Sequence, residues 1–585
     1  MKKFLPALIL FLVTTKTQAQ DLPHWLTQEE QLLLPTYLQN HGNTLRGTDP
    51  PTFTPRAMAE WEEISGLLIT WTSYTPILRQ IVEIAQPECT VYIVCSDSNS
   101  VKTNLTNNGI SIYNIKFLEE PYNSVWSRDY GQWNIYKDDV DELSFVDWIY
   151  NRPRPLDDVI PVALADYTGL PLYSITNAPY DLVHTGGNFM VDGHGTGFSS
   201  KLILDENGIN NDFYVTEKTE ADIDTIMKKY LGLNRYILME TLPYDVIHHI
   251  DMHMKLLDEE TLLVGEFPTG VSDGPQIETN LQYIQDNYWD CYGRPYRIVR
   301  IPMVPSTGGS YPPSGDYRTY ANAVFINKTI LIPLYREEYD TTAVRIYKEN
   351  LPGYNVVGID CDNSGADIIS ALGAVHCITK EIGQSDPIWI DHAPLLNTSD
   401  DINPYLVEAK IETPSGVTDA TLYWTTDTAA GFTPETMTAE LTDSFYAYIP
   451  AQISGTQVFY YINASSNSGR NISKPLTAPQ GWLRFKVQVP SGSSEIKNPS
   501  IILYDPFPNP ASSSVNIGFV LPRVMSCKLF LTDILGRIVF TSANQTLHSG
   551  QHKFTVDVSA LPAGVYHLNL VAEDQLLEKK VLVGN

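Results

Sequence analysis

The sequence predicts an α/β domain followed by two small all-β sandwich domains, and three observations support this prediction. Between about residues 52 and 384, short apolar runs typical of strands alternate with helix-like segments, as expected of the α/β class. After about residue 385 the helical periodicity ends, and short strands follow with Pro, Gly, Ser and Thr between them. A chain of 585 residues is also too long to fold around a single hydrophobic core.

The first 19 residues have the pattern of a secretory signal peptide. Lys2 and Lys3 precede an apolar run over residues 4–13, and Thr17-Gln-Ala19 supplies the small residue expected at a cleavage site. That run is too short to span a bilayer, and no later segment has 18 apolar residues in succession. We therefore expect an exported, soluble protein without a transmembrane segment. Residues 20–51, polar with Pro and Gly, are expected to form a leader or N-terminal extension.

Strands and helices alternate through residues 52–384, the predicted α/β domain. Strands are predicted at residues 64–70 and 91–94, on either side of a helix at residues 76–85. Similar apolar runs predict further strands at residues 202–204, 261–264, 296–300, 323–326 and 329–332.

Two all-β domains are predicted to follow. Residues 390–490 carry strand-like runs at about one per ten residues, which is typical of a β-sandwich; they lie at residues 405–411, 420–424, 444–449 and 457–462. Residues 491–502 are predicted to be a linker, because Ser- and Gly-rich sequence is flexible. Turn signals at residues 505–510, 533–537 and 561–566 predict a second small sandwich over residues 503–585.

Charge and cysteine content exclude several classes of function. A formal net charge of -29 argues against nucleic acid or an anionic membrane surface as a partner, whereas a cationic substrate would be attracted. The six cysteines are irregularly spaced and form no CxxC pair, so neither a zinc ribbon nor a disulfide framework is predicted.

One late cysteine, Cys377, is a candidate nucleophile. It follows a glycine-bearing loop and precedes a short apolar run, which places a thiol at a loop-to-strand junction. A lone cysteine is more often a small buried hydrophobic residue than a nucleophile. The catalytic interpretation depends on three earlier motifs, Trp126-Ser-Arg-Asp129, His249-Ile-Asp251 and Tyr320-Ala-Asn322. Two carboxylates, a histidine, an amide and a thiol are the groups needed to hydrolyse a guanidinium through a covalent intermediate.

Each of these groups has a role in that chemistry. Asp129 and Asp251 could grip the guanidinium N–H groups, and the thiolate would then attack the central carbon. His249 could protonate the departing ammonia and then activate the water that releases the product. Asn322 could position the thiol or the substrate, and Trp126 could stack on the guanidinium or cover its aliphatic stem.

Other interpretations of the same residues remain open. On a strand, His249, Asp251 and His253 would share one face and could bind zinc, although such a site would leave Cys377 unused. Asp129 follows Arg128 and could belong to an ordinary ion pair. A papain-like protease would give the paired aspartates no purpose. An amidinotransferase, or a binding protein built on a catalytically dead scaffold, are further alternatives.

Taken together, the motifs resemble one family. Trp126-Ser-Arg-Asp129, Gly186-Gly187, His249-Ile-Asp251, Tyr320-x-Asn322 and His376-Cys-Ile-Thr379 resemble, in order, the bacterial (Porphyromonas-type) peptidylarginine deiminase and agmatine deiminase family over residues 52–384. The resemblance implies a five-fold pseudosymmetric α/β propeller (pentein) and a reaction that needs no metal or organic cofactor. It also implies site residues: Cys377 as nucleophile, His249 as general acid and base, Asp129 and Asp251 as guanidinium ligands, Asn322 in the catalytic set, and Trp126, Gly187, Asn188 and Tyr320 as substrate contacts.

The choice of guanidine depends on two further segments. Agmatine deiminases typically carry Glu-Gly-Gly where this chain has Thr185-Gly-Gly-Asn188. Tyr150-Asn-Arg152-Pro-Arg154-Pro resembles the secreted peptidylarginine deiminases, in which such an arginine pair receives the C-terminal carboxylate of the substrate peptide. Agmatine has no carboxylate, and two arginines would repel its cation; a solvated turn is the alternative for this segment. The resemblance therefore implies hydrolysis of peptidyl arginine, expected at the C-terminus, to citrulline and ammonia, with agmatine deimination as the alternative.

The C-terminal segment resembles a second family. Asp505-Pro-Phe-Pro-Asn-Pro510, Asp533-Ile-Leu-Gly-Arg537 and the turn at residues 561–566 resemble the C-terminal sorting domain of the type IX (Por) secretion pathway. The resemblance implies the type IX machinery as a partner and a secreted or surface-attached product. The preceding sandwich, residues 390–490, resembles an immunoglobulin-like module.

Overall fold

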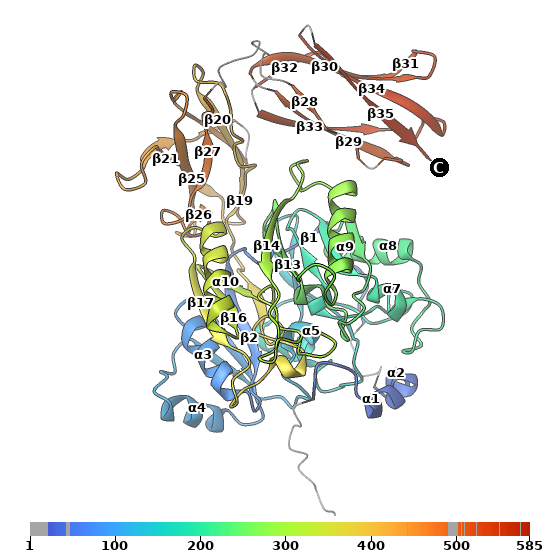
Figure 1. Cartoon of the computed structure of the whole chain (residues 1–585), viewed down its shortest axis with the longest axis vertical. Helices are drawn as coiled ribbons and strands as arrows, with labels where there is room; N and C mark the ends of the chain where they lie inside the picture. The colour runs from blue at the N-terminus through green and yellow to red at the C-terminus, as the bar shows by residue number, and fades with distance from the viewer. Residues whose placement is uncertain are drawn as a thin grey trace, which may run out of the picture.

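The computed structural model describes residues 22–41, 47–440, 443–489 and 501–584, apart from residues 505, 508, 522, 549 and 574. The predicted signal peptide and most of the predicted linker lie outside these residues. Figure 1 shows a large α/β body with two β units at one end, while the short helices α1 (Gln28–Leu33) and α2 (Tyr37–His41) lie away from both β units.

The α/β body is built from five sheets that share one local plan among the described residues. In each sheet two neighbouring strands run antiparallel, and a helical crossover then leads to a third strand that runs parallel to the second. Three sheets follow the plan with β9 (Met190–Val191), β10 (Thr196–Ser200), α8 (Glu220–Leu231) and β11 (Arg235–Met239); β12 (Met254–Asp258), β13 (Thr261–Glu266), α9 (Gly274–Asn287) and β14 (Arg297–Pro302); and β15 (Val324–Ile326), β16 (Thr329–Leu334), α10 (Glu337–Asn350) and β17 (Asn355–Asp360).

The two remaining sheets close the body and extend it. β18 (Lys380–Gly383) pairs antiparallel with β2 (Ile64–Thr70), so the end of the α/β sequence completes the sheet that its beginning started. That sheet continues through β3 (Thr90–Val94) and β4 (Ile115–Leu118), with α3 (Thr75–Ala85) and α4 (Ser98–Asn107) as crossovers. The last sheet contains β1 (Pro55–Ala57), β5 (Trp133–Lys137), β6 (Leu143–Tyr150), β7 (Leu172–Ile175) and β8 (Val183–His184), with α6 (Ile160–Thr168) before β7.

Hydrophobic patterning explains most of these elements. The helix α3 has proline in its first turn and buries residues that recur three and four apart, which places them on one face. The central parallel strands are buried almost throughout, as expected where helices cover a sheet. The strands predicted at residues 64–70, 91–94, 261–264 and 329–332 are therefore confirmed, as is the helix at residues 76–85.

One predicted strand is wrong. Residues 202–204 lie in the helix α7 (Leu202–Asn207), of which Ile203 and Asn207 are the buried residues. A run of three apolar residues fits a strand and one helical turn equally well, so periodicity alone could not separate them.

The first β unit consists of two facing antiparallel sheets. One contains β19 (Trp389–Asp391), β20 (Tyr405–Glu412), β24 (Ser444–Ile449) and β23 (Thr438–Ala439); the other contains β22 (Thr433–Thr436), β21 (Val417–Thr425), β25 (Gln457–Ser466), β26 (Asn471–Lys474) and β27 (Leu483–Lys486). Burial alternates along β20, so one face of each sheet supplies the core, as in a β-sandwich.

The second β unit has its own core. Its sheets contain β28 (Ile502–Leu503), β29 (Ser514–Leu521) and β33 (Gly550–Asp557), and β31 (Ile538–Thr541), β30 (Met525–Asp533), β32 (Gln545–Leu547), β34 (Gly564–Ala572) and β35 (Gln575–Val583). Ile501 packs in this core, so the unit begins before the predicted boundary at residue 503.

The described N-terminal segment, residues 22–41, packs on the α/β body instead of extending away from it. Leu34 and Tyr37 are buried in a small apolar cluster with Ile149 and Val183. The Tyr37 hydroxyl donates a hydrogen bond of 2.8 Å to a carboxylate oxygen of Asp158. A leader or N-terminal extension was expected here, and its short helices with buried Leu34 and Tyr37 fix the segment to the α/β body.

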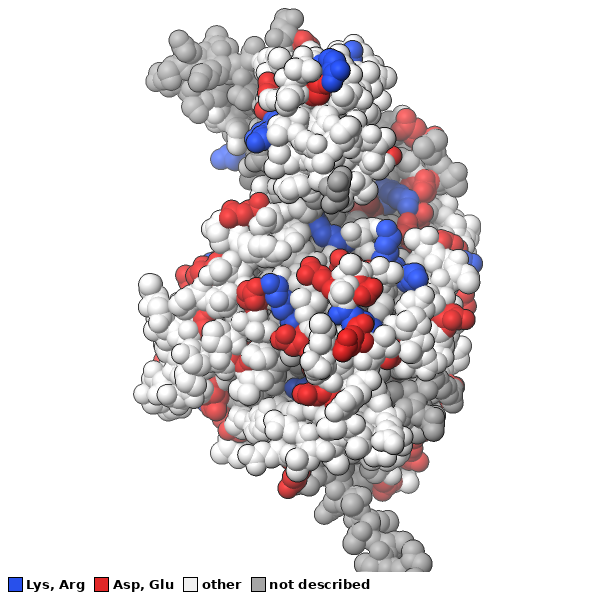
Figure 2. Space-filling model, turned by 90° about the vertical axis from the view of Figure 1, so that its right-hand side faces the viewer, with Lys and Arg blue, Asp and Glu red and all other residues white. Residues whose placement is uncertain are grey.

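The surface is acidic without a single dominant patch on the face seen in Figure 2. Asp and Glu side chains are spread over that face, with Lys and Arg side chains among them. None of the helices in the described part of the chain combines the length and the apolar character needed to span a bilayer.

Two helix-ending glycines give a test of the packing. Gly232 after α8 and Gly169 after α6 both adopt left-handed backbone conformations, with φ of 73° and 75°. A Cβ on Gly232 would lie 1.8 Å from the Pro55 carbonyl oxygen, whereas a Cβ on Gly169 would meet no atom within 4 Å. We expect Gly169→Ala to lower the free energy of unfolding by about 1 kcal/mol and Gly232→Ala by at least ~3 kcal/mol. Urea unfolding followed by Trp fluorescence measures the difference, and equal losses would contradict the close approach of β1.

Candidate active site

The five repeated units each contribute a residue just before a strand of their antiparallel pair, and these residues meet. Three of them lie on single helical turns, α5 (Ser127–Tyr130), η3 (Gly186–Asn188) and η4 (Ile250–Met252). Residues far apart in sequence are thereby brought to one place; they are Asp129 before β5, Gly187 before β9, Asp251 before β12, Asn322 before β15 and Cys377 before β18.

Gly187 marks the centre of this group. A Cβ built on Gly187 would lie 2.5 Å from Nδ1 of His249, 2.9 Å from Oδ1 of Asp129 and 3.2 Å from Oδ2 of Asp251. The backbone N–H of Gly187 donates a hydrogen bond of 3.1 Å to the same Asp129 oxygen. Two carboxylates and an imidazole therefore surround a small space that only glycine leaves open.

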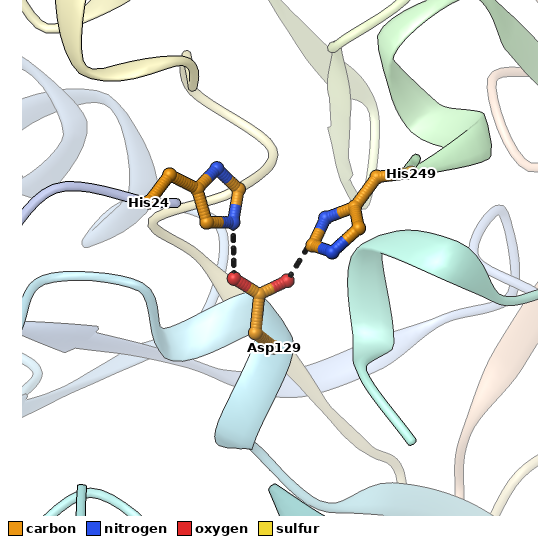
Figure 3. Close-up of side chains that lie close together, drawn as sticks. All are labelled: His24, Asp129 and His249. Carbon is orange, nitrogen blue, oxygen red and sulfur yellow. Dashed lines mark hydrogen bonds and ion pairs between the residues drawn. The ribbon is translucent and has the colours of Figure 1, made fainter. Parts of the chain in front are cut away.

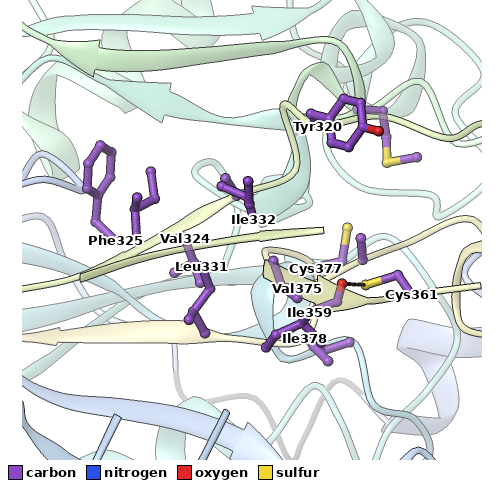
Figure 4. Packing of buried hydrophobic residues seen from close by; sticks show 14 of the residues in the cluster. Tyr320, Val324, Phe325, Leu331, Ile332, Ile359, Cys361, Val375, Cys377 and Ile378 are labelled. Carbon is purple, nitrogen blue, oxygen red and sulfur yellow. Dashed lines mark hydrogen bonds between the residues drawn. The ribbon is translucent and has the colours of Figure 1, made fainter. Parts of the chain in front are cut away.

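The thiol of Cys377 lies against the carboxylate of Asp251. Nδ2 of Asn322 lies 3.0 Å from Sγ of Cys377 and 3.0 Å from Oδ2 of Asp251. The Cys377 sulfur is 3.5 Å from that Asp251 oxygen. Figure 4 shows Cys377 among the side chains of the apolar cluster that includes Val375 and Ile378. The amide of Asn322 thus contacts both the thiol and the acid.

Burial controls the ionisation of the thiol. Burial raises the pKa of Cys377 well above its ordinary value, and the negative charges of Asp251 and Asp129 raise it further. The resting group is therefore a neutral thiol. A cation held between the two aspartates would oppose the same charges and favour the thiolate.

His249 is free to exchange a proton. Its two ring nitrogens have no hydrogen-bond partner, and Nδ1 lies 3.5 Å from Oδ1 of Asp129. Burial lowers the pKa of His249 well below its usual value, although the charge of Asp129 acts in the opposite direction. The imidazole is therefore neutral and can accept a proton.

Asp129 stays ionised in the same environment. Burial opposes its ionisation, but the charge and hydrogen bond of His24 and the charge of Arg152 outweigh burial and hold the pKa of Asp129 well below its ordinary value. The alternative that Asp129 merely pairs with Arg128 is wrong, because Arg128 donates hydrogen bonds to both carboxylate oxygens of Glu381 at 2.5 and 2.8 Å.

His24 occupies the site, and sequence reasoning missed it. Its Nε2 bonds to Oδ2 of Asp129, and its ring stacks on Trp126 with centroids 4.2 Å apart and planes 7° apart. Figure 3 shows the His24 and His249 rings reaching Asp129 from two sides. No motif surrounds His24, and it lies in the segment expected to be a leader, so no sequence signal pointed to it.

A buried charged network holds Asp251, and the sequence did not predict this network. Nδ1 of His376 lies 2.8 Å from Oδ2 of Asp251, and its Nε2 lies 2.9 Å from Oε1 of Glu60. Lys255 donates to the other Glu60 oxygen at 2.5 Å. Burial opposes the ionisation of Glu60, but the cations around it hold its pKa well below the ordinary value. His376 is a positioning residue that fixes the carboxylate beside the thiol.

Two predicted contacts are not brought to the group. The Tyr320 hydroxyl donates to Oδ1 of Asp340 at 2.7 Å, and its ring is buried in the apolar cluster. The Asn188 side chain bonds to the backbone of Ser200 on both its oxygen and its nitrogen. Both side chains support the loops that carry the site.

The predicted arginine pair lies next to His24. Nε of Arg152 donates to the His24 carbonyl oxygen at 3.1 Å, and Nε of Arg154 donates to Oε1 of Glu30 at 2.7 Å. Both arginine side chains are buried, so the alternative of a solvated turn is wrong.

The predicted metal alternative fails on local structure. Residues 250–252 form a turn of 3₁₀ helix, so alternate residues do not share a face as they would on a strand. His253 is buried with both ring nitrogens unpartnered, and burial lowers its pKa to about 4. Two other groups in the described chain could hold a metal ion, namely His24, Asp129 and His249, and Glu60, His376 and Glu381.

An α/β body with a thiol, an imidazole and two aspartates around one small space defines a deiminase-type site. Residues 56–382 match the model of the family described as Porphyromonas-type peptidyl-arginine deiminase, which covers more than half of the chain. The chain belongs to this family. Residues 506–584 match the "Secretion system C-terminal sorting domain", so the second resemblance is confirmed as well.

Similar proteins carry deiminase names. A "Putative agmatine deiminase" of Legionella pneumophila strain Philadelphia 1 is 27% identical and covers 46% of this chain and 75% of its own. One of Vibrio parahaemolyticus is 23% identical and covers 46% and 78%.

Solved deiminase structures share the fold. An X-ray structure of a "putative agmatine deiminase" superposes with a TM-score of 0.50 at 19% identity, over 58% of this chain and all of that chain, 100%. The "Putative Arginine Deiminase from Porphyromonas gingivalis" gives a TM-score of 0.49 at 21% identity, over 57% and 99%. The superposition at a TM-score of 0.50 shows that the α/β body shares the fold of that structure.

The raised pKa of Cys377 predicts how its reactivity depends on pH. The thiolate, which is the reactive form, becomes populated only as pH rises through the raised pKa. We expect slow alkylation of Cys377 by iodoacetamide at pH 7, with a rate that still increases above pH 9. A free cysteine peptide, whose pKa is about 8.5, is the control. Mass spectrometry of the Cys377 peptide gives the rate, and a rate that levels off near pH 7 would contradict this account.

Proposed function

We propose that this protein hydrolyses peptidyl arginine, at the C-terminal position, to citrulline and ammonia. The observation that carries the proposal is the placement of Cys377, His249, Asp129 and Asp251 around the space left by Gly187. Two buried carboxylates bind a planar cation best when its N–H groups reach both of them. The guanidinium carbon would then lie beside the sulfur of Cys377.

The proposed reaction proceeds in two steps. The guanidinium neutralises Asp129 and Asp251, which lets the thiol pass its proton to neutral His249, and the sulfur forms a bond to the guanidinium carbon. One C–N bond then breaks, and His249 supplies the proton with which ammonia leaves. This leaves a thiouronium on Cys377. His249 next removes a proton from water, and the new C–O bond forms. The C–S bond then breaks, His249 returns its proton to the sulfur to restore the thiol, and the ureido product releases its hydroxyl proton to the ammonia.

The arginine pair supports a substrate with a carboxylate. Arg152 and Arg154 are buried close to the site, and each side chain already donates to an oxygen. A C-terminal carboxylate would be attracted to these cations, whereas the free ammonium of agmatine would be repelled. Agmatine is the second candidate substrate. The relatives are named agmatine deiminases, and the two acids and the thiol could act on the guanidinium of either substrate.

Architecture and export complete the proposal. The five sheets of one local plan support a five-fold pseudosymmetric propeller as the catalytic domain. The sorting domain supports export to the cell surface or medium, and we propose the type IX machinery as its partner and residues 1–19 as a cleaved signal. The two-sheet unit over residues 390–490 is proposed to be an immunoglobulin-like module. The reaction as proposed uses no metal or organic cofactor.

Substrate comparison tests the proposal. We expect ammonia release from a peptide ending in arginine to exceed release from agmatine, because only the peptide engages the arginine pair. Cys377→Ala should abolish both activities, since no other described thiol lies in this group. Citrulline and ammonia assays measure both products. Equal or greater release from agmatine would contradict the proposed specificity, and turnover by Cys377→Ala would contradict the nucleophile.

The role of Arg152 has a separate test. We expect Arg152→Ala to lower kcat/KM for the C-terminal arginyl peptide about tenfold more than for agmatine, because it removes a charge-assisted contact that only the peptide can make. Comparing two substrates in one variant cancels any general damage to the site. Arg345→Ala, which removes an exposed cation on α10, is the control and should leave the ratio unchanged. If the ratio of the two kcat/KM values is unchanged in Arg152→Ala, the proposed contact between Arg152 and the substrate carboxylate is wrong.

A further inference from the structure

We infer that residues 22–30 are an intramolecular inhibitor, which binds in the substrate site of the same chain and places the His24 ring where the guanidinium would lie. The inference rests on the proposed function for the identity of the substrate, but the contacts of the segment are independent of it. Three features of residues 22–30 carry the inference: the ring, the backbone and the Glu30 carboxylate.

The His24 ring has the properties that a guanidinium site binds: it is planar, cationic and carries N–H donors. Its Nε2 faces a carboxylate oxygen of Asp129, and its Nδ1 lies 2.6 Å from the Leu372 carbonyl oxygen. Both partners only accept hydrogen bonds, so both nitrogens donate and the ring binds as the imidazolium cation. It stacks on Trp126 and meets His249 edge-on, with centroids 4.8 Å apart and planes at 86°. A planar cation with N–H donors thus binds one of the two predicted guanidinium ligands.

The backbone of the segment uses the groups proposed for the rest of the substrate. The carbonyls of residues 22–24 accept, in order, from Nε1 of Trp126 at 2.9 Å, Nη2 of Arg154 at 2.7 Å and Nε of Arg152 at 3.1 Å. The Glu30 carboxylate also bonds to Nε of Arg154 at 2.7 Å. The segment therefore presents a cation to Asp129 and a carboxylate to Arg154, and these are the two charges of a C-terminal arginine.

The segment also closes the site. His24, Asp129, Trp126, His249 and Cys377 are each 0% exposed. A guanidine cannot reach the Cys377 sulfur while His24 stays between Trp126 and Asp129. The helical turns that follow anchor the segment, since Leu34 and Tyr37 are buried against the α/β body.

An intramolecular competitor has a distinct kinetic effect. The substrate must displace the segment, so the apparent KM is raised by the ratio of closed to open chains, while kcat at saturation is unchanged. Loss of a charge-assisted contact from the segment should lower that ratio. A residue that takes part in the reaction would instead lower kcat when it is replaced.

The test uses the full chain with matched variants. His24→Ala and Glu30→Gln each remove one charged contact of the segment, and Glu29→Gln changes the neighbouring exposed glutamate as the control. Two quantities are measured: the kinetics with a peptide ending in arginine, and the rate at which iodoacetamide labels Cys377 at fixed pH. We expect His24→Ala and Glu30→Gln to lower the apparent KM and to speed labelling, each about tenfold or more, with kcat unchanged. Glu29→Gln should match the unaltered chain in both assays.

The two assays separate this inference from the proposed function. Unchanged KM and unchanged labelling in both His24→Ala and Glu30→Gln would overturn the inhibitor, as would a lower kcat in His24→Ala. If no guanidine substrate is turned over but labelling is faster in both variants, the proposed function falls. In that case the covering role of the segment stands, because labelling requires only access to the thiol.

Discussion

Two buried carboxylates beside a buried thiol are the constraint on which this site depends. Asp129 and Asp251 approach the same small space, and burial together with their charges keeps Cys377 protonated. Such an arrangement is costly unless a cation lies between the acids. In the proposed reaction, this requirement accounts for the binding of a planar N–H donor and for a thiol that loses its proton only when such a group is bound. In this structure the side chain beside Asp129 is His24.

The fold meets this constraint through repetition. Each of the five units places a residue just before a strand of its antiparallel pair, so chain segments more than two hundred residues apart converge. The pairing of β18 with β2 is the step that brings Cys377 back to the first sheet. The ionic network of Glu60, His376 and Lys255 then fixes Asp251 from behind. Precise placement of the thiol thus depends on closure of the whole body, and not on any one element.

The sequence was most informative where chemistry and local pattern coincide. The apolar runs of β2, β3 and β13 and the motifs around Asp129, His249 and Cys377 were predicted, because strand periodicity and reactive side chains are both visible locally. Tyr320 and Asn188 belong to the same motifs, yet they support the loops; proximity in sequence does not determine which way a side chain points. The contacts of His24 with Asp129 and of His376 with Glu60 join segments that are distant in sequence, and no local sequence pattern predicts such contacts. The segment at residues 202–204 shows that a local pattern can also be too short, since three apolar residues do not distinguish a helix from a strand.

The central claim is that the Cys377 sulfur forms a bond to a guanidinium carbon held between Asp129 and Asp251. The most direct measurement is acid quenching of the enzyme during turnover of an arginyl peptide, followed by mass spectrometry of the peptide that contains Cys377. The account predicts a transient adduct on Cys377 whose mass equals that of the substrate less ammonia. Citrulline formation with Cys377 unmodified at every time sampled, or with the adduct on another residue, would contradict it.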